Sequence, residues 1–260
     1  MSMLTLCGAG IKTLAHVTEE MLAALETADQ VLYLVNEPLC ERWIQQRAKQ
    51  AESLVDLYFS SPDRRTSYEA ITHKILTVLE TVEHLCVVFY GHPCVFANPG
   101  LLAVHHVLTT TQHDAIILPG ISAMDCLFAD LAIDPGVPGC QFVEATDLLI
   151  YERKLNPELH LLIWQIATLG QLGHASCEDA LLSKQRYTRC YEHLRRWYPK
   201  THPMVIYEAS LYPTIAPVIR NHQLQDLIAQ PEMTTLSTLY LPPLETTRRP
   251  AKAMQDLLFT

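Results

Sequence analysis

The chain has 260 residues, of which 49% are hydrophobic and 18% are charged, and its formal net charge is −9 at pH 7. This length and composition predict a compact folded protein with a full hydrophobic core, built as one large domain or two small ones. A general nucleic-acid binder needs a basic face that displaces counterions from phosphates, so the acidic balance argues against that class.

The first 119 residues alternate predicted strands and helices at the spacing of βαβ units. Short apolar runs indicate the strands, apolar residues at helical spacing indicate the helices, and Thr18 is the expected N-cap of the first helix. The expected strands cover residues 4–6, 30–35, 54–58, 86–89 and 115–118, and the expected helices cover residues 17–27, 38–51, 68–83 and 101–110. This order predicts an N-terminal α/β domain, residues 1–119, with a five-stranded, mainly parallel sheet.

The pattern changes after Pro119. Residues 134–139 read Asp-Pro-Gly-Val-Pro-Gly, which is typical of a turn-rich link, and polar helical stretches separate the strands that follow. Strands are expected at residues 159–166, 204–207 and 237–241, and a charged amphipathic helix is expected at residues 181–198. We therefore expect a second, mixed α/β domain over residues 120–260, with residues 245–260 as a strap or a final helix.

The spacing of cysteines and histidines argues against two common kinds of site. The eight cysteines include no Cys-x-x-Cys pair and fall mostly in apolar runs, which indicates buried, reduced thiols and a cytoplasmic protein. The twelve histidines include no His-Glu-x-x-His sequence, so no metal site is expected. The first residues lack a charged n-region, and no run approaches about 18 apolar residues, so we expect neither a targeting signal nor a membrane partner.

Two shaped loops follow predicted strands of the first domain. Residues 89–100 read Phe-Tyr-Gly-His-Pro-Cys-Val-Phe-Ala-Asn-Pro-Gly, and residues 118–123 read Leu-Pro-Gly-Ile-Ser-Ala. In open α/β sheets, ligands bind at the carboxyl ends of the strands, where these loops lie. The first loop carries the phenol of Tyr90, the imidazole of His92 and the close-approach glycine Gly91. Together the two loops predict a ligand site.

The sequence Gly8-Ala9-Gly10 after the first strand resembles the beginning of a dinucleotide fingerprint. It lacks the third glycine and an acidic residue at the expected spacing, so a tight structural turn and a ligand-facing loop are both open interpretations. No Gly-x-x-x-x-Gly-Lys sequence is present, which argues against phosphate transfer.

A polar cluster between Tyr58 and Tyr68 precedes the third predicted helix. If the helix begins near Pro62, Arg64 and Tyr68, which are four residues apart, project from one helix face, and Tyr58 at the end of the expected strand can converge on them. A nearby cation lowers the pKa of a phenol, so an arginine-assisted phenolate is a candidate base for a very weak acid. The alternative is an ordinary surface arginine beside tyrosines that pack by their rings.

Three of these motifs together resemble the tetrapyrrole methylase superfamily, whose members bind S-adenosylmethionine between two α/β domains. They are the glycine-rich first loop, Tyr-Gly-His-Pro at 90–93 and Leu-Pro-Gly-Ile-Ser-Ala at 118–123. Within the superfamily the chain is most similar to the borosin peptide α-N-methyltransferases. Further motifs along nearly the whole chain carry this similarity: Phe-Ala-Asp at 128–130, Glu-Ala-Thr-Asp-Leu at 144–148, Ile-Trp-Gln at 163–165 and Thr-Thr-Leu-Ser-Thr-Leu-Tyr-Leu-Pro-Pro at 234–243.

The resemblance implies a two-domain fold in which a parallel Rossmann-like sheet is followed by a second mixed α/β domain that completes the cofactor cleft. It implies transfer of a methyl group from S-adenosylmethionine, which becomes S-adenosylhomocysteine, to backbone amide nitrogens of a peptide, without a metal. The catalytic residues of the family would fall on Tyr58, Arg64, Tyr68 and Tyr90. Arg64 suits the developing imidate oxygen, Tyr68 or Tyr90 would donate a hydrogen bond, and Tyr58 is the candidate base.

The cofactor contacts that the resemblance implies lie in both domains. They are Tyr90, His92, Val95, Phe96, Ser122, Ala123, Gln165, Ile166, Ser237 and Thr238. Ser122 has a structural alternative as the cap of the helix that follows it. Gln165, a polar residue at the end of an apolar strand, would form hydrogen bonds with the adenine or the methionine part of the cofactor.

The resemblance also implies a homodimer and a peptide partner. Fungal members carry the substrate peptide as a C-terminal extension, whereas this sequence stops shortly after Pro243 and its end, with Arg248, Arg249 and Lys252, does not resemble an apolar core peptide. We therefore expect the split type, which methylates a separate small precursor peptide in trans. Cys94 stands where relatives usually have glycine. Two alternatives are open: methylation of a tetrapyrrole or another small molecule, and a catalytically silent protein that binds a peptide or S-adenosylmethionine.

Overall fold

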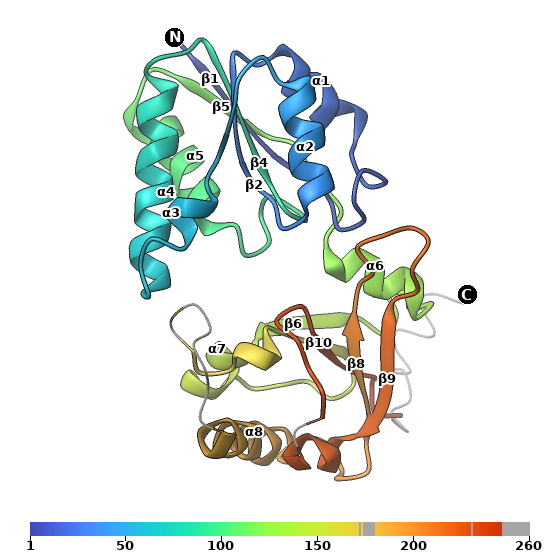
Figure 1. Cartoon of the computed structure of the whole chain (residues 1–260). Helices are drawn as coiled ribbons and strands as arrows, with labels where there is room; N and C mark the ends of the chain where they lie inside the picture. The colour runs from blue at the N-terminus through green and yellow to red at the C-terminus, as the bar shows by residue number, and fades with distance from the viewer. Residues whose placement is uncertain (172, 174–179, 230, 246–260) are drawn as a thin grey trace, which may run out of the picture. The chain divides into compact units, whose positions relative to one another are not determined.

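The computed structural model describes residues 1–171, 173, 180–229 and 231–245 (Figure 1). The chain forms two compact units, each assembled from segments that are separate in the sequence. The first unit contains Met1–Ile133, Gly170–Asp179 and Tyr207–Ile219, and the second contains Asp134–Leu169, Ala180–Ile206 and Arg220–Thr260. The domain boundary expected after residue 119 stays a prediction. Most of the predicted tail, including Arg248, Arg249 and Lys252, lies outside the described residues.

The sheet of the first unit confirms the predicted five-stranded parallel architecture. Its strands are β1 (Met3–Gly8), β2 (Gln30–Leu34), β3 (Ala51–Ser53), β4 (His84–Phe89) and β5 (Asp114–Ile117). They lie in the order β3-β2-β4-β1-β5, and every neighbouring pair is parallel. The central strands β1 and β4 are buried along most of their length, as expected of parallel strands that are covered on both faces.

Helices cover both faces of this sheet (Figure 1). Helices α1 (Glu19–Thr27) and α2 (Pro38–Arg47) pack on one face, and α3 (Val55–Tyr58), α4 (Arg64–Leu79) and α5 (Asn98–Thr110) pack on the other. Side chains alternate along β1, so Leu6 joins the cluster under α4 and α5, whereas its neighbour Cys7 joins the cluster under α1 and α2. The adjacent strands β1 and β4 lead to helices on opposite faces. Their carboxyl ends therefore form the switch point where sheets of this kind bind ligands.

Local signals account for where the helices begin. The hydroxyl of Thr18 accepts a hydrogen bond from the amide three residues on, at 3.1 Å, which confirms its predicted role as an N-cap. Glu37 caps α2 in the same way and is followed by Pro38, whose fixed φ suits the first helical position. Asp63 caps α4, so this helix begins at Arg64, one turn earlier than predicted.

The predicted strand over residues 54–58 is wrong. The third strand is the shorter β3, which precedes this segment, and nearly all of the segment forms helix α3. The amide of Leu54 still donates to the carbonyl of Tyr33 on β2, at 2.8 Å, but the amide of Tyr58 donates back to the carbonyl of Leu54 at 2.9 Å, which is a helical bond. Leu54, Leu57 and Tyr58 pack in one cluster, because spacings of three and four residues bring side chains together on a helix.

The second sheet of the chain is mixed, as predicted. Its strands lie in the order β6-β7-β10-β8-β9, with β6 and β7 parallel and β7 and β10 antiparallel. They are β6 (Cys140–Glu144), β7 (His160–Trp164), β8 (Pro203–Glu208), β9 (Val218–Gln223) and β10 (Thr238–Leu241). The sequence pattern does not indicate the edge strands β6 and β9, because both are only partly buried and carry several polar residues.

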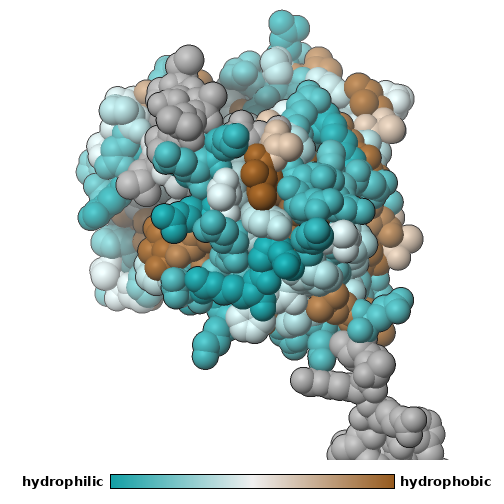
Figure 2. Space-filling view, turned by 90° about the horizontal axis from the view of Figure 1, so that it is seen from below, coloured by the Kyte–Doolittle hydropathy of each residue, from teal (hydrophilic) through white to brown (hydrophobic). Residues whose placement is uncertain are grey.

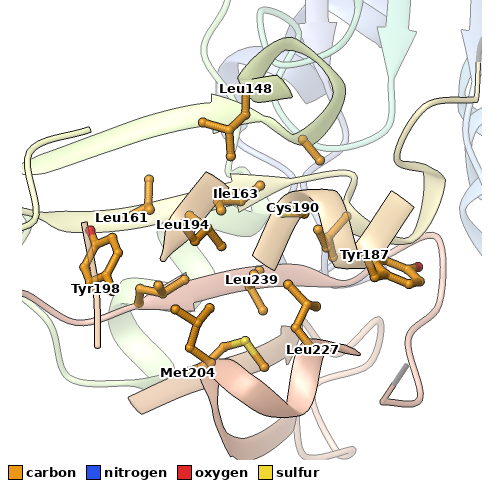
Figure 3. Close-up of a cluster of buried hydrophobic side chains, with 14 of the residues drawn as sticks. Leu148, Leu161, Ile163, Tyr187, Cys190, Leu194, Tyr198, Met204, Leu227 and Leu239 are labelled. Carbon is orange, nitrogen blue, oxygen red and sulfur yellow. The ribbon is translucent and has the colours of Figure 1, made fainter. Parts of the chain in front are cut away.

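The remaining helical segments are short, apart from one. They are α6 (Ala123–Asp130) in the first unit, and α7 (Ala145–Ile150), η1 (Ile166–Thr168), α8 (Ala180–Leu194) and η2 (Leu224–Ala229) in the second. Leu161 and Ile163, two residues apart on β7, point to the same side of the sheet (Figure 3). They pack there with apolar side chains from the helices and the neighbouring strands, among them Leu148, Cys190, Leu194, Met204 and Leu239.

Three buried histidines tie elements of the second unit to loop carbonyls. The Nε2 atom of His193 lies 3.0 Å from one such oxygen, and that of His202 lies 2.8 Å from the carbonyl oxygen of Pro242. His160 contacts a loop carbonyl and also the hydroxyl of Tyr240, at 2.8 Å. Burial lowers the pKa of His202, because desolvation disfavours the charged ring more than the Pro242 carbonyl favours it.

The surface seen from below in Figure 1 is dominated by hydrophilic side chains, with hydrophobic ones in separate groups (Figure 2). Among the described residues, seven cysteines are free thiols and five of these are buried. Within the same residues, no helix combines the length and the apolar character needed to cross a bilayer.

The lowered pKa of His202 predicts a loss of stability in acid. The neutral ring is favoured in the folded state, so its contribution to the free energy of unfolding is fully present above the ordinary histidine pKa of 6.5 and is lost as the pH falls below that value. We expect His202→Gln, which keeps a neutral hydrogen-bond donor, to lose less stability than the parent between about pH 7 and pH 5. Urea unfolding at both pH values measures the difference. The exposed His105→Gln serves as the control, and an unchanged pH dependence in His202→Gln would contradict the prediction.

Candidate functional site

The loops that follow β1, β4 and β5 meet backbone to backbone at the carboxyl edge of the first unit's sheet. Gly10 and Gly91 exchange two main-chain hydrogen bonds, of 3.1 and 3.0 Å. A Cβ atom on Gly8 would lie 2.1 Å from the carbonyl oxygen of Gly91, and one on Gly120 would lie 2.9 Å from the same oxygen. No side chain fits at such distances, so these positions require glycine. The Gly8-Ala9-Gly10 sequence is therefore a structural junction that brings all three loops together.

The loop after β4 holds the predicted cofactor residues His92, Val95 and Phe96. The Nδ1 atom of His92 accepts a hydrogen bond from the amide of Cys94 at 3.0 Å, and its carbonyl accepts one from the amide of Val95 at 3.1 Å. The side chain of Cys94 is exposed, so the turn accommodates a residue other than glycine there. Phe96 has a φ of 55°, in the left-handed region that side chains disfavour, and is 44% exposed. Backbone strain of this kind clusters at functional sites.

The loop after β5 ends in the cap of helix α6. The Oγ atom of Ser122 accepts a hydrogen bond from the amide of Asp125 at 3.3 Å, and the carboxylate of Asp125 accepts one from the amide of Ser122 at 2.7 Å. These two bonds form a capping box, which confirms the structural alternative for Ser122. A cofactor contact from Ser122, or from Ala123 at the start of α6, stays a prediction.

The second unit carries the other four predicted cofactor residues. Gln165 follows β7 with a φ of 56°, again in the left-handed region. Ile166 packs its side chain into the core of this unit. Ser237 and Thr238 are buried where β10 begins, and the Oγ atom of Ser237 accepts a hydrogen bond from the amide of Thr234 at 2.8 Å. Because β10 is antiparallel to β7, its start lies beside the end of β7, and the four residues gather at one edge of the second sheet.

The structure brings Tyr58, Arg64 and Tyr68 together. Arg64 and Tyr68 lie one turn apart on α4, and Tyr58 lies at the end of α3, with its ring centroid 6.3 Å from that of Tyr68. Arg64 is only partly exposed, and its Nη2 atom donates to the carbonyl oxygen of Gly173 at 3.2 Å. The arginine is therefore anchored beside the phenols, which disfavours its interpretation as an ordinary surface residue.

Burial decides the ionisation of Tyr68. Desolvation raises its pKa most, the neighbouring Tyr58 raises it further, and Arg64 offsets only part of the shift. Arg64 lowers the pKa of Tyr68, as expected, but burial and Tyr58 outweigh it, so the pKa lies above its ordinary value. At neutral pH Tyr68 is a protonated phenol that can donate a hydrogen bond.

Tyr90 belongs to another polar group of the first unit. Burial raises the pKa of Tyr90 to about 12, although a hydrogen bond with Asn36 offsets part of the shift. Tyr207 interacts electrostatically with Tyr90 and donates a hydrogen bond to the carboxylate of Asp130 at 2.7 Å. Sequence reasoning missed Asn36, Asp130 and Tyr207. Asn36 could have been predicted, because it lies just after β2, at the same end of the sheet as the loop that carries Tyr90. Nothing in the sequence indicates that Tyr207 lies near Tyr90.

Metal ligands do not accompany these groups in the described part of the chain. No three or more histidine, cysteine, aspartate or glutamate side chains gather there in a way that could hold a metal ion.

Comparison with known proteins identifies the family. A sequence model of the Tetrapyrrole (Corrin/Porphyrin) Methylases matches residues 3–214. The chain belongs to this family. Uroporphyrin III C-methyl transferase from Thermus thermophilus superposes with a TM-score of 0.65 at 16% identity, covering 98% of this chain and 100% of that chain. Diphthine synthase superposes with a TM-score of 0.62 at 14% identity, covering 93% and 90%. At these identities the likeness concerns the fold alone, and it confirms the predicted tetrapyrrole-methylase-like architecture.

Several proteins that are similar to this chain have names that include both a methyltransferase and a peptide precursor. A "methyltransferase/ribosomally synthesized type I borosin cyclic peptide precursor" of Cerrena unicolor is 32% identical, over 99% of this chain and 62% of that protein. One of Coprinopsis marcescibilis is 34% identical, over 92% and 62%. The lentinulin A precursor of Lentinula edodes is 33% identical, over 98% and 61%. The chain thus spans about three fifths of the length of these relatives.

The glycine junction predicts a strong effect of a single methyl group. We expect Gly8→Ala to lose roughly 1–3 kcal/mol of unfolding free energy, the usual cost of overpacking, because its Cβ atom would clash with the carbonyl of Gly91. Gly136→Ala is the matched control, since its Cβ atom would meet only the carboxylate of Asp134 in an exposed turn. Urea unfolding compares the two variants with the parent, and equal stability of both variants would contradict the prediction.

Proposed function

We propose that this tetrapyrrole methylase family member uses S-adenosylmethionine to methylate backbone amide nitrogens of a peptide that is supplied in trans as a separate precursor. The observation that carries the proposal is the grouping of two phenols and an anchored guanidinium, Tyr58, Tyr68 and Arg64. Relatives whose names join a methyltransferase to a borosin cyclic peptide precursor support a peptide substrate. The homodimer and the cytoplasmic location that the resemblance implies stay predictions.

The residues at the carboxyl edge of the first sheet fit an S-adenosylmethionine site. The glycine junction keeps the main chain bare of side chains there, and the first turn of α6 presents amides that the helix itself does not use. The cofactor would be held by Tyr90, His92, Val95, Phe96, Ser122 and Ala123 from the first unit and by Gln165, Ile166, Ser237 and Thr238 from the second. When bound, the cofactor would supply an activated methyl group together with its own leaving group.

The proposed reaction requires the site to make a very weak acid nucleophilic. As the amide nitrogen loses its proton, negative charge develops on the amide oxygen, and the guanidinium of Arg64 would stabilise that charge. Tyr68, kept protonated by burial, would donate a hydrogen bond to this oxygen, and Tyr90, with a pKa of about 12, is available as another donor. Tyr58 is the candidate base that would accept the amide proton.

Methylation of a tetrapyrrole or another small molecule is the alternative within the same family. A polycarboxylate substrate would need several cations, but Arg65, the neighbour of Arg64, is exposed and pairs with Glu69 at 3.0 Å. A catalytically silent protein that binds a peptide or S-adenosylmethionine is the alternative from another class. The phenols beside Arg64 suit amide deprotonation and favour the enzyme over both alternatives.

Mass spectrometry tests the proposed activity directly. We expect incubation of the purified protein with S-adenosylmethionine and the short peptide encoded beside its gene to add whole methyl groups to the peptide. Fragment masses should place these groups on backbone nitrogens. An unchanged peptide, in a sample where calorimetry detects bound cofactor, would contradict the proposal and favour the small-molecule methylase or the silent binder.

The phenol and guanidinium group predicts which variants lose turnover. We expect Tyr58→Phe to reduce kcat by roughly 10²-fold or more, since it removes the candidate base. Arg64→Ala should reduce kcat by roughly 10²–10³-fold, since it removes charge stabilisation of the amide oxygen. Both variants should keep peptide affinity, which fluorescence anisotropy with a labelled peptide measures.

Matched controls come from exposed residues of the same kinds. Tyr151→Phe and Arg65→Ala alter exposed side chains and should leave kcat unchanged. Full activity of Tyr58→Phe would remove that residue as the base, and loss of peptide binding in Arg64→Ala would assign the arginine to substrate affinity instead of catalysis.

A further inference from the structure

The guanidinium of Arg64 is anchored at one nitrogen and unsatisfied at another. Its Nη2 atom donates to the carbonyl oxygen of Gly173 at 3.2 Å. Its Nε atom is buried and has no hydrogen-bond partner within the described part of the chain. A buried donor without an acceptor is costly, and native structures rarely leave one. We therefore expect a ligand atom to complete the hydrogen bonding of Nε.

The carbonyl of Gly173 is held by the same turn that starts helix α4. Gly173 forms an antiparallel bridge with Asp63, which is the N-cap of α4. A Cβ atom on Gly173 would lie 2.4 Å from the carbonyl oxygen of Pro62. The φ of Gly173 lies outside the left-handed region, so the close approach and not the backbone conformation requires glycine. The turn at Pro62 and Asp63 thus positions both Arg64 and the Gly173 carbonyl that anchors it.

We propose that Gly173 is a positioning residue for Arg64, whose guanidinium it orients so that Nε can donate to the oxygen of the substrate amide. The guanidinium is planar, so anchoring Nη2 restricts the plane in which the Nε–H bond lies. The donor is then in place before charge develops on the amide oxygen, which is how preorganised sites stabilise a transition state. The inference rests on the proposed function, because it assigns a partner to the residue that would stabilise the reacting amide.

The variant Gly173→Ala tests this role in the full chain. Its Cβ atom cannot lie 2.4 Å from the carbonyl oxygen of Pro62, so the main chain at Gly173 must shift, and with it the carbonyl that anchors Arg64. We expect kcat for peptide methylation to fall by roughly 10²-fold, as for a small misplacement of a catalytic group. The KM for the peptide and the affinity for S-adenosylhomocysteine should stay close to those of the parent. Gly136→Ala, the same substitution in an exposed turn, is the control.

Kinetics separate positioning from other roles. A kcat equal to that of the parent would overturn the inference, because the contact would then be dispensable. A higher kcat would also overturn it, because the Gly173 carbonyl would then compete with the substrate. A fall in cofactor affinity together with the fall in kcat would assign Gly173 a structural role instead.

A second measurement does not depend on turnover. In protein labelled with ¹⁵N-arginine, the Nε–H signal of Arg64 is the one that disappears in Arg64→Lys. We expect this signal to be sharp and slow to exchange with water in the parent, and to shift or broaden in Gly173→Ala. An unchanged signal would overturn the inference even if the parent is active. Absence of methylation by the parent would instead overturn the proposed function, and the signal would still report whether Gly173 orients Arg64.

Discussion

The close approach of main chains at Gly8, Gly91 and Gly120 is the constraint on which the rest of the candidate site depends. Without Cβ atoms at these positions, the loops after three different strands pack at main-chain distance. The junction lies at the switch point of the sheet, so it presents the loop after β4 and the capped start of α6 at the edge where ligands bind. A larger residue would separate these loops, and the side chains that they carry would shift relative to one another.

Burial then sets the chemical state of the predicted catalytic tyrosines. Tyr68 and Tyr90 both have raised pKa values because desolvation disfavours the phenolate, so both are hydrogen-bond donors at neutral pH. Arg64 brings positive charge beside Tyr68 and is anchored by a main-chain carbonyl. Donors and charge that are held before reaction are what a site needs when negative charge develops on an amide oxygen. The arrangement is thus consistent with the reaction proposed above.

Features that depend on residues close together in the sequence could be predicted, whereas features that depend on packing between elements could not. The proximity of Arg64 and Tyr68 could be predicted for a helix that begins near Pro62, because a spacing of four residues joins one helix face. The segment 54–58 could not, because a short apolar run fits a strand and a helix equally well and only packing decides between them. There Leu57 and Tyr58 join the cluster of Leu54 as a helical turn. The edge strands β6 and β9 stay hidden for a related reason, since partial exposure leaves no continuous apolar run.

By itself the sequence determined the alternation of strands and helices in the first unit, the parallel sheet, the shaped loops and the family. These depend on local periodicity, on glycine and proline at turns and on contiguous motifs. Only the tertiary structure decided that Asn36 bonds Tyr90, that Tyr207 bonds Asp130 and that Gly173 anchors Arg64. It also decided that the pKa of Tyr68 rises beside an arginine. The physical reason is that burial, and contacts between residues far apart in the chain, exist only once the elements pack together.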